Sequence, residues 1–142
     1  MKIESLMTRH VEFASGDDSA AELAVVMGDL DVGALPIGTE GDLLGVITDR
    51  DILYRVVAKG LDPTTTVARD IVSFPVIGCR PDDSLQVAMD LMGAHRIRRL
   101  AVRSEDGTVV GWLTLADVSR ALLLESGTVQ SGLRELSRET AG

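Results

Sequence analysis

Apolar positions recur with helical spacing in two parts of the chain. After Asp17-Asp18-Ser19, the apolar side chains stand at i, i+3, i+4 and i+7, at Leu23, Val26, Met27 and Leu30. The segment from Ser84 to Ala94 collects an apolar face from Leu85, Ala88, Leu91 and Met92. Each segment begins with Asp-Asp-Ser, and these residue types favour helix N-caps. The pattern therefore predicts two amphipathic helices.

Short apolar runs bounded by turn residues predict strands around these helices. The runs are 11–13, 34–37, 43–47, 76–77, 100–102 and 109–113. Pro36 lies in one of them and is best placed at a sheet edge. Further helices are expected over 49–59, ended by Gly60, and over 115–124, with a single helical turn in 67–72. Each half of the chain then has the element order β-α-β-β-α.

The two halves also repeat each other residue by residue. Gly45-Val46-Ile47-Thr48-Asp49-Arg50-Asp51-Ile52 returns as Gly111-Trp112-Leu113-Thr114-Leu115-Ala116-Asp117-Val118, 66 residues later. Both octets fit Gly-apolar-apolar-Thr-x-x-Asp-apolar. A repeat with a fixed period indicates two copies of one structural unit. We divide the chain into a first domain (1–60), a linker (61–66), a second domain (67–124) and a polar tail (125–142). The tail could form a weakly apolar helix or be disordered.

Chain size bears on how the units pack. The chain has 142 residues, 45% of them hydrophobic. A unit of about 60 residues buries little apolar surface alone, so we expect the two units to share one core. No apolar run is long enough for a membrane span, and the N-terminus does not have the pattern of a signal peptide. The lone Cys79 cannot form an internal disulfide, and a cytoplasmic location is expected.

Charge and composition exclude some function classes. The net charge of −8 repels nucleic-acid phosphates, and an aromatic content of 3% offers no stacking platform for single strands. The two histidines, His10 and His95, stand at unmatched repeat positions, so no metal cluster is recognisable. No acid–base pair or nucleophile motif is visible, so we predict no catalytic residues and no enzyme activity.

The Thr-x-x-Asp pair of each octet has two interpretations. The structural one is a capping box at a helix start, in which Thr and Asp exchange hydrogen bonds with each other's backbone. The functional one is a nucleotide-binding corner, because a helix N-terminus favours phosphate and a carboxylate can accept bonds from both ribose hydroxyls. The residues concerned are Thr48 with Asp51 and Thr114 with Asp117.

As a set, these features resemble the cystathionine-β-synthase (CBS) domain family over residues 5–124. The matching segments are Ser5-Leu6-Met7-Thr8 and Asp70-Ile71-Val72-Ser73, the Asp-Asp-Ser helix starts, the Leu-Pro-Ile and Leu-Ala-Val strands, and the two octets. The resemblance implies an α/β (α+β) fold of tandem β-α-β-β-α CBS repeats packed with pseudo-twofold symmetry, called a Bateman module. It also implies adenosine ligands in the clefts between the repeats, and dimerisation. Several stretches look like the small stand-alone CBS-pair proteins of the hypoxic or stress-response type.

The resemblance also assigns roles to residues of this chain. It places Asp51 with Thr48, and Asp117 with Thr114, at the ribose or phosphate. It places the first short strand of each repeat, Val11-Glu12 and Val76-Ile77, at the adenine. Basic residues before the Leu-x-Val strand meet phosphates, and here these are Arg98 and Arg99. The first repeat has the uncharged Gly33-Ala34 instead, so the two clefts should differ and the Asp117 cleft is favoured for a phosphorylated ligand.

The sequence thus predicts a non-enzymatic regulatory CBS-pair protein. It would bind AMP, ADP, ATP or S-adenosylmethionine without any tightly bound cofactor or metal. It would act as a homodimer on an unknown protein target, with no nucleic acid or membrane as partner. The alternatives are a structural or interaction module that has lost its ligand, and an enzyme with the cleft as its active site.

Overall fold

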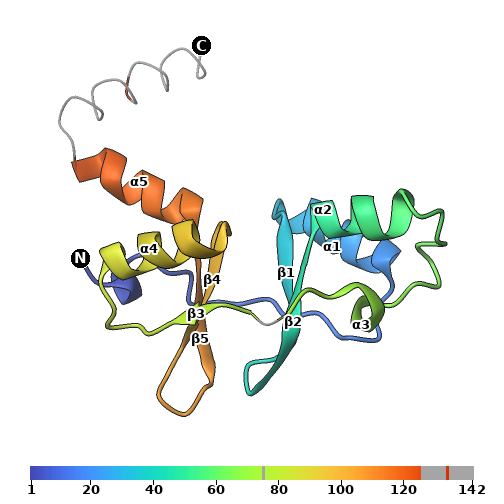
Figure 1. Cartoon of the computed structure of the whole chain (residues 1–142), viewed down its shortest axis with the longest axis horizontal. Coiled ribbons are helices and arrows are strands. Elements are labelled where there is room, and N and C mark those ends of the chain that lie inside the picture. The colour runs from blue at the N-terminus through green and yellow to red at the C-terminus, as the bar shows by residue number, and fades with distance from the viewer. Residues whose placement is uncertain (75, 126–133, 135–142) are drawn as a thin grey trace.

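The computed structural model describes residues 1–74, 76–125 and 134 of the chain, and the fold is mixed α/β (Figure 1). In chain order the elements are η1 (Ile3–Ser5), α1 (Ala20–Leu30), β1 (Ala34–Thr39), β2 (Asp42–Thr48), α2 (Asp49–Ile52), η2 (Leu53–Val57), α3 (Ala68–Ile71), β3 (Gly78–Cys79), α4 (Leu85–His95), β4 (Arg99–Arg103), β5 (Val109–Thr114) and α5 (Leu115–Glu125). The predicted tandem repeats are confirmed. The tail (125–142), for which a weakly apolar helix or disorder was considered, lies outside the described residues except at 125 and 134.

The two amphipathic helices begin and end in the same way. Ser19 caps α1 and Ser84 caps α4, each accepting a hydrogen bond from the backbone N–H three residues on, at 3.1 and 3.3 Å. Asp31 ends α1 and Arg96 ends α4, both in the left-handed conformation at φ 54°. Because non-glycine residues rarely adopt this conformation, its occurrence at equivalent positions supports the repeat.

The strands form two small sheets. In the first repeat β1 pairs antiparallel with β2, and in the second β4 pairs antiparallel with β5 and parallel with β3. The predicted strand at 11–13 is wrong, because only Ala14 makes a bridge there, to Ile37 of β1. The strand predicted at 76–77 lies at Gly78–Cys79 instead. In each repeat, the segment that follows the crossing from the other half pairs with the sheet over one or two residues only: Ala14 in the first repeat and Gly78–Cys79 in the second.

The helix predicted over 49–59 has two parts. Asp49–Ile52 is α-helical, whereas Leu53–Val57, labelled η2, is a π-helix with wider turns. Gly60 ends the segment at φ 70°, as predicted, and its N–H donates to the carbonyl of Val57 at 3.1 Å. No helix in the described ranges is both long and apolar enough to cross a membrane.

Each repeat receives a segment of chain that precedes the other one. The N-terminal arm, residues 1–8, runs along the second repeat, with bridges Lys2–Ser84 and Thr8–Trp112. Figure 1 shows this segment, in blue, starting beside α4 before it crosses to the first repeat. Residues 66–73, which we call the linker arm, run along the first repeat, with bridges Val67–Ser19 and Ser73–Val46. The arms are therefore exchanged between the two halves.

The exchanged arms complete two separate hydrophobic cores. Ile3 is fully buried among the core residues of the second repeat. Ala68 and Ile71 are buried in the core of the first repeat. The expectation of one shared core is therefore wrong: each unit gains the apolar surface it lacks from an arm instead.

The glycine that opens each octet lies where an arm crosses the sheet. A Cβ atom on Gly45 would overlap the carbonyl oxygen of Ser73 in the linker arm. A Cβ on Gly111 would lie 3.0 Å from the carbonyl oxygen of Thr8 in the N-terminal arm. The octet therefore requires glycine because another backbone passes this close.

Candidate functional site

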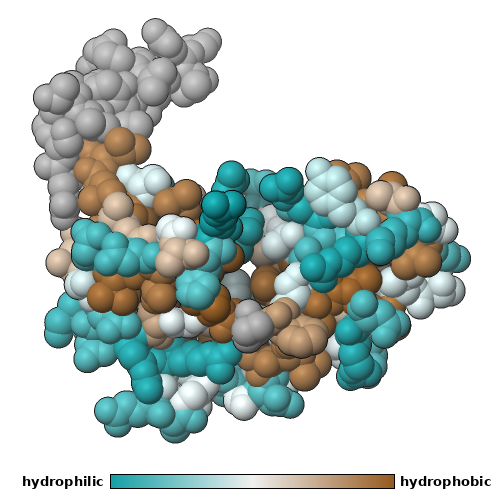
Figure 2. Space-filling model, in the orientation of Figure 1, coloured by the Kyte–Doolittle hydropathy of each residue, from teal (hydrophilic) through white to brown (hydrophobic). Residues whose placement is uncertain are grey.

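One cleft gathers most of the polar side chains selected from the sequence. It has a volume of about 830 Å³ and lies between the two repeats. Its lining comprises Thr8, His10, Val11, Glu12, Leu30, Asp31, Val32, Gly33, Ala34, Leu35, Pro36, Arg98, Arg99, Trp112, Thr114, Leu115, Ala116, Asp117, Ser119 and Arg120. Figure 2 shows hydrophilic side chains gathered along the upper boundary between the two halves. The size suits a small organic ligand.

The acid of the second octet lies at the start of α5, on the cleft. The Thr114 N–H donates to Asp117 Oδ2 at 3.1 Å, and the Asp117 N–H donates to Thr114 Oγ1 at 3.1 Å. The predicted capping box is therefore present. Asp117 Oδ1 accepts a hydrogen bond from Arg120 Nη2 at 2.6 Å, and the Asp117 side chain is 13% exposed. The carboxylate is held in place at the cleft by its own helix.

Two arginines supply positive charge to the same cleft: Arg98, directly before β4, and Arg99, its first residue. The carbonyl of Arg98 accepts a hydrogen bond from the N–H of Leu115 at 2.8 Å, which joins the start of β4 to the start of α5. A Cβ on Gly33 would lie 3.1 Å from Arg99 Nη2 and 3.3 Å from Asp49 Oδ2. Gly33, the uncharged position of the first repeat, thus leaves space for the Arg99 guanidinium of the second.

The opposite wall comes from the segment that follows the N-terminal arm. His10, Val11 and Glu12 line the cleft, and His10 Nε2 lies 2.7 Å from Glu12 Oε1. This segment belongs to the first repeat, whereas Asp117 and the arginines belong to the second. The cleft is therefore built by both repeats.

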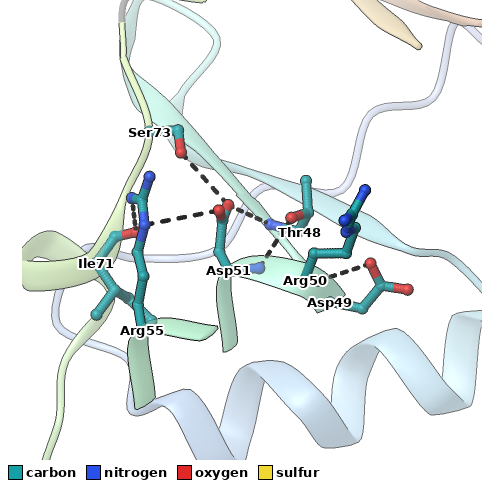
Figure 3. Close-up of polar contacts among 7 residues, drawn as sticks. All are labelled: Thr48, Asp49, Arg50, Asp51, Arg55, Ile71 and Ser73. Atoms are coloured by element: carbon teal, nitrogen blue, oxygen red, sulfur yellow. Dashed lines mark hydrogen bonds and ion pairs between the residues drawn. The ribbon is translucent and has the colours of Figure 1, made fainter. Parts of the chain in front are cut away.

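The equivalent acid of the first repeat is engaged by the linker arm (Figure 3). Asp51 and Thr48 form a capping box with bonds of 2.9 and 3.1 Å. Asp51 Oδ2 also accepts from Ser73 Oγ at 3.4 Å, and Oδ1 lies 3.8 Å from Arg55 Nε. Arg55 Nη1 donates to the carbonyl of Ile71 at 2.8 Å. These contacts tie the linker arm to the first repeat.

The structure separates the predicted site residues into two groups. Six line the cleft described above: Val11, Glu12, Arg98, Arg99, Thr114 and Asp117. Four lie outside its lining: Thr48, Asp51, Val76 and Ile77. Arg50, next to Asp51, is exposed and places its guanidinium 5.6 Å from the centre of the Tyr54 ring. It is a surface residue of the helix.

The sequence reasoning missed several lining residues. Arg120 could have been found, because residues three apart on a helix lie side by side and it follows Asp117 by three. Thr8 and Asp31 had no comparable signal, since they reach the cleft through the arm exchange and through a left-handed helix end. In the described part of the chain, no three His, Cys, Asp or Glu side chains group so as to hold a metal ion.

Comparison with known proteins agrees with this architecture. The family model of the CBS domain matches the chain twice, over residues 3–58 and 68–124. The chain therefore belongs to the CBS domain family and has two repeats.

Its relatives include stand-alone proteins of similar length. The chain is 32% identical over 140 residues to the CBS domain-containing protein YhcV of Bacillus subtilis, covering 99% of this chain and 89% of that protein. It is 35% identical over 118 residues to hypoxic response protein 1 of Mycobacterium tuberculosis, covering 82% of each. Among solved structures, the hexameric CBS-CP12 protein from bloom-forming cyanobacteria superposes with a TM-score of 0.75 at 26% identity, covering 99% of this chain and 85% of that one.

Proposed function

We propose that this protein is a non-enzymatic regulator that binds an adenosine ligand in the cleft between its two CBS repeats. The candidate ligands are AMP, ADP, ATP and S-adenosylmethionine. The observation that carries the proposal is that Asp117, Arg98 and Arg99 line one cleft together with the backbone segment at Val11 and Glu12. An adenosine nucleotide needs an acid for its ribose, a surface for its adenine and cations for its phosphates, and these residues supply all three.

Each part has a chemical task. The carboxylate of Asp117 accepts hydrogen bonds from the two ribose hydroxyls, as acids do in other nucleotide-binding folds. The guanidinium groups of Arg98 and Arg99 bind phosphate oxygens, for which their planar donor geometry is suited. The start of α5 adds the positive end of a helix dipole. A ligand in contact with both repeats favours one arrangement of the two, and this is the signal that a protein target acting in trans would detect.

We propose that the protein acts as a homodimer. One related solved structure is described as hexameric, which supports self-association. The chain itself exposes Leu53, Tyr54 and Val57 on η2, between 51% and 60% each. A cluster of large apolar side chains on one short helix is typical of a contact surface.

A ligand-free interaction module is the second candidate. It is favoured by the observation that Asp51 and Asp117 are both engaged by their own capping boxes and by nearby arginines. Capping alone would then account for both residues. In that case the apolar helix surface, not the cleft, would carry the function.

Titration calorimetry with the four adenosine compounds tests the proposal. The proposal predicts binding of at least one compound to the wild type, and a loss of at least tenfold in affinity for Asp117→Asn, which keeps the side chain's shape without its charge. Binding of none of the four would favour the interaction module. Turnover of a bound nucleotide by the pure protein would overturn the non-enzymatic assignment.

A further inference from the structure

One lining residue of the cleft has no equivalent in the first repeat. Arg120 follows Asp117 by three residues, and its Nη2 donates to Asp117 Oδ1 at 2.6 Å. The other oxygen, Oδ2, accepts the backbone N–H of Thr114 in the capping box. Arg120 therefore binds the carboxylate oxygen that takes no part in the capping box.

The first repeat places its arginine differently. The position equivalent to Arg120 is Tyr54, and the position equivalent to Arg55 is Ala121. Arg55 lies 3.8 Å from Asp51 Oδ1 and donates to the carbonyl of Ile71 in the linker arm. Arg55 thus joins two parts of the fold. For Arg120, by contrast, the one polar contact within the described residues is to Asp117, and the side chain lines a cleft.

Exposure shows which partner of the Arg120–Asp117 pair is able to move. The Arg120 side chain is 70% exposed, whereas the Asp117 side chain is 13% exposed and accepts the backbone N–H of Thr114. An exposed ion pair is weakly stabilising, so the guanidinium can leave at small cost when a better partner is present. Arg98 and Arg99 line the same cleft, so a phosphate bound there can contact more than one guanidinium group.

We propose that Arg120 is a specificity-determining residue that makes the cleft select phosphorylated over unphosphorylated adenosine compounds. This rests on the proposed function. A ribose hydroxyl that binds Asp117 Oδ1 competes with the Arg120 guanidinium for that oxygen. A nucleotide offers the displaced guanidinium a phosphate, whereas a nucleoside offers it only water. The competition therefore weakens nucleoside binding more than nucleotide binding.

The test compares the dissociation constants of adenosine, AMP, ATP and S-adenosylmethionine for the wild type, Arg120→Gln and Arg55→Gln. We expect the wild type to bind its best nucleotide more tightly than adenosine. In Arg120→Gln, loss of a charge-assisted hydrogen bond weakens the nucleotide by about tenfold or more. Adenosine affinity stays equal or rises, so the selectivity ratio falls. Arg120→Lys retains part of the ratio because its charge remains.

Arg55→Gln is the matched control, because it removes an arginine paired with the equivalent acid of the other repeat. Its selectivity ratio should equal that of the wild type. An unchanged selectivity ratio in Arg120→Gln would overturn the inference about Arg120 but not the proposed function. A wild-type preference for adenosine or S-adenosylmethionine over both nucleotides would do the same. Failure of the wild type to bind any of the four compounds would overturn the proposed function as well.

Discussion

Thr8 and Trp112 are joined by two backbone hydrogen bonds, from the Thr8 N–H at 2.8 Å and from the Trp112 N–H at 2.9 Å. This bridge fixes the N-terminal arm to β5, the strand that ends at the Thr114–Asp117 corner. Thr8 and Trp112 also line the cleft. The arm is therefore part of the core of the second repeat and part of the wall of the candidate binding site.

Truncation of the buried anchor of this arm should destabilise the protein. Ile3 is fully buried in the second core, so Ile3→Ala should lower the free energy of unfolding by about 2–5 kcal/mol. Urea unfolding followed by far-UV circular dichroism measures this change. The control is Val25→Ala, because Val25 is 62% exposed and should change stability by less than about 0.5 kcal/mol. Equal effects of the two substitutions would show that the arm does not belong to the core.

The octet glycine of the first repeat should not tolerate a methyl group. In Gly45→Ala the new Cβ would overlap the Ser73 carbonyl oxygen, so the linker arm must shift. We expect a loss of about 1–3 kcal/mol in unfolding free energy, the usual cost of overpacking. Gly41→Ala is the control, since a Cβ there meets nothing within 4 Å. Chemical denaturation of the pair measures the difference, and a Gly45→Ala protein as stable as Gly41→Ala would refute the close approach.

Most of the fold could be predicted because its signals are local. Caps, apolar periodicity and turn residues predicted α1, α4 and the two hairpins, and the octet repeat predicted their duplication. The arm exchange has no local signal, because it depends on which repeat a short segment packs against. In the sequence Ile3 and Ile71 are single apolar residues, and no neighbouring residue shows which repeat they pack against. For this reason the single shared core and the strand at 11–13 were wrong.

The candidate site was predictable to the extent that it repeats. Asp117 and Thr114 follow from the octet. The two arginines do not repeat, and only the resemblance to the CBS domain family pointed to them, through their place before the Leu-Ala-Val strand. The sequence does not show that Val11 lines the same cleft as Asp117, since the two residues lie in different repeats. The different surroundings of Asp51 and Asp117 also depend on the linker arm, whose Ser73 contacts Asp51.

Removing the charge of an arginine on β4 should weaken ligand binding only where that arginine lines the cleft. Arg99→Gln should weaken binding of a phosphorylated ligand by about tenfold or more, because a charge-assisted hydrogen bond is lost. Arg103 lies on the same strand and outside the lining of the cleft. Arg103→Gln should therefore leave the affinity unchanged in calorimetric titrations. A loss of similar size in both variants would indicate a general charge effect in place of a phosphate contact.

The thiol of Cys79 should be unreactive in the folded protein. Burial, with a smaller contribution from the charge of Asp83, raises the pKa of Cys79 from 9.0 to about 11. Thiolate is the reactive form, so labelling with a disulfide reagent at pH 8 should be slow until denaturant is added. Rapid labelling of the native protein would contradict the burial of Cys79.

The same pKa shift makes a prediction about stability. Above about pH 9 the unfolded thiol loses its proton while the folded one retains it, so stability should fall between about pH 9 and 11. In Cys79→Ser this part of the fall should be absent. Thermal unfolding across this pH range compares the two proteins.

The most direct test of the cleft as an adenosine site is the shift in unfolding temperature of Asp117→Asn and Asp51→Asn with AMP, ADP, ATP or S-adenosylmethionine. A ligand at about 100 times its dissociation constant adds roughly 2.7 kcal/mol, on the order of 5–10 °C for a chain of this size. We predict that one compound shifts the wild type and Asp51→Asn alike, and that the shift of the folded Asp117→Asn is at most about half as large, as a tenfold or greater loss of affinity requires. Equal shifts in all three proteins, or no shift in any, would contradict the assignment of the ligand to the Asp117 cleft.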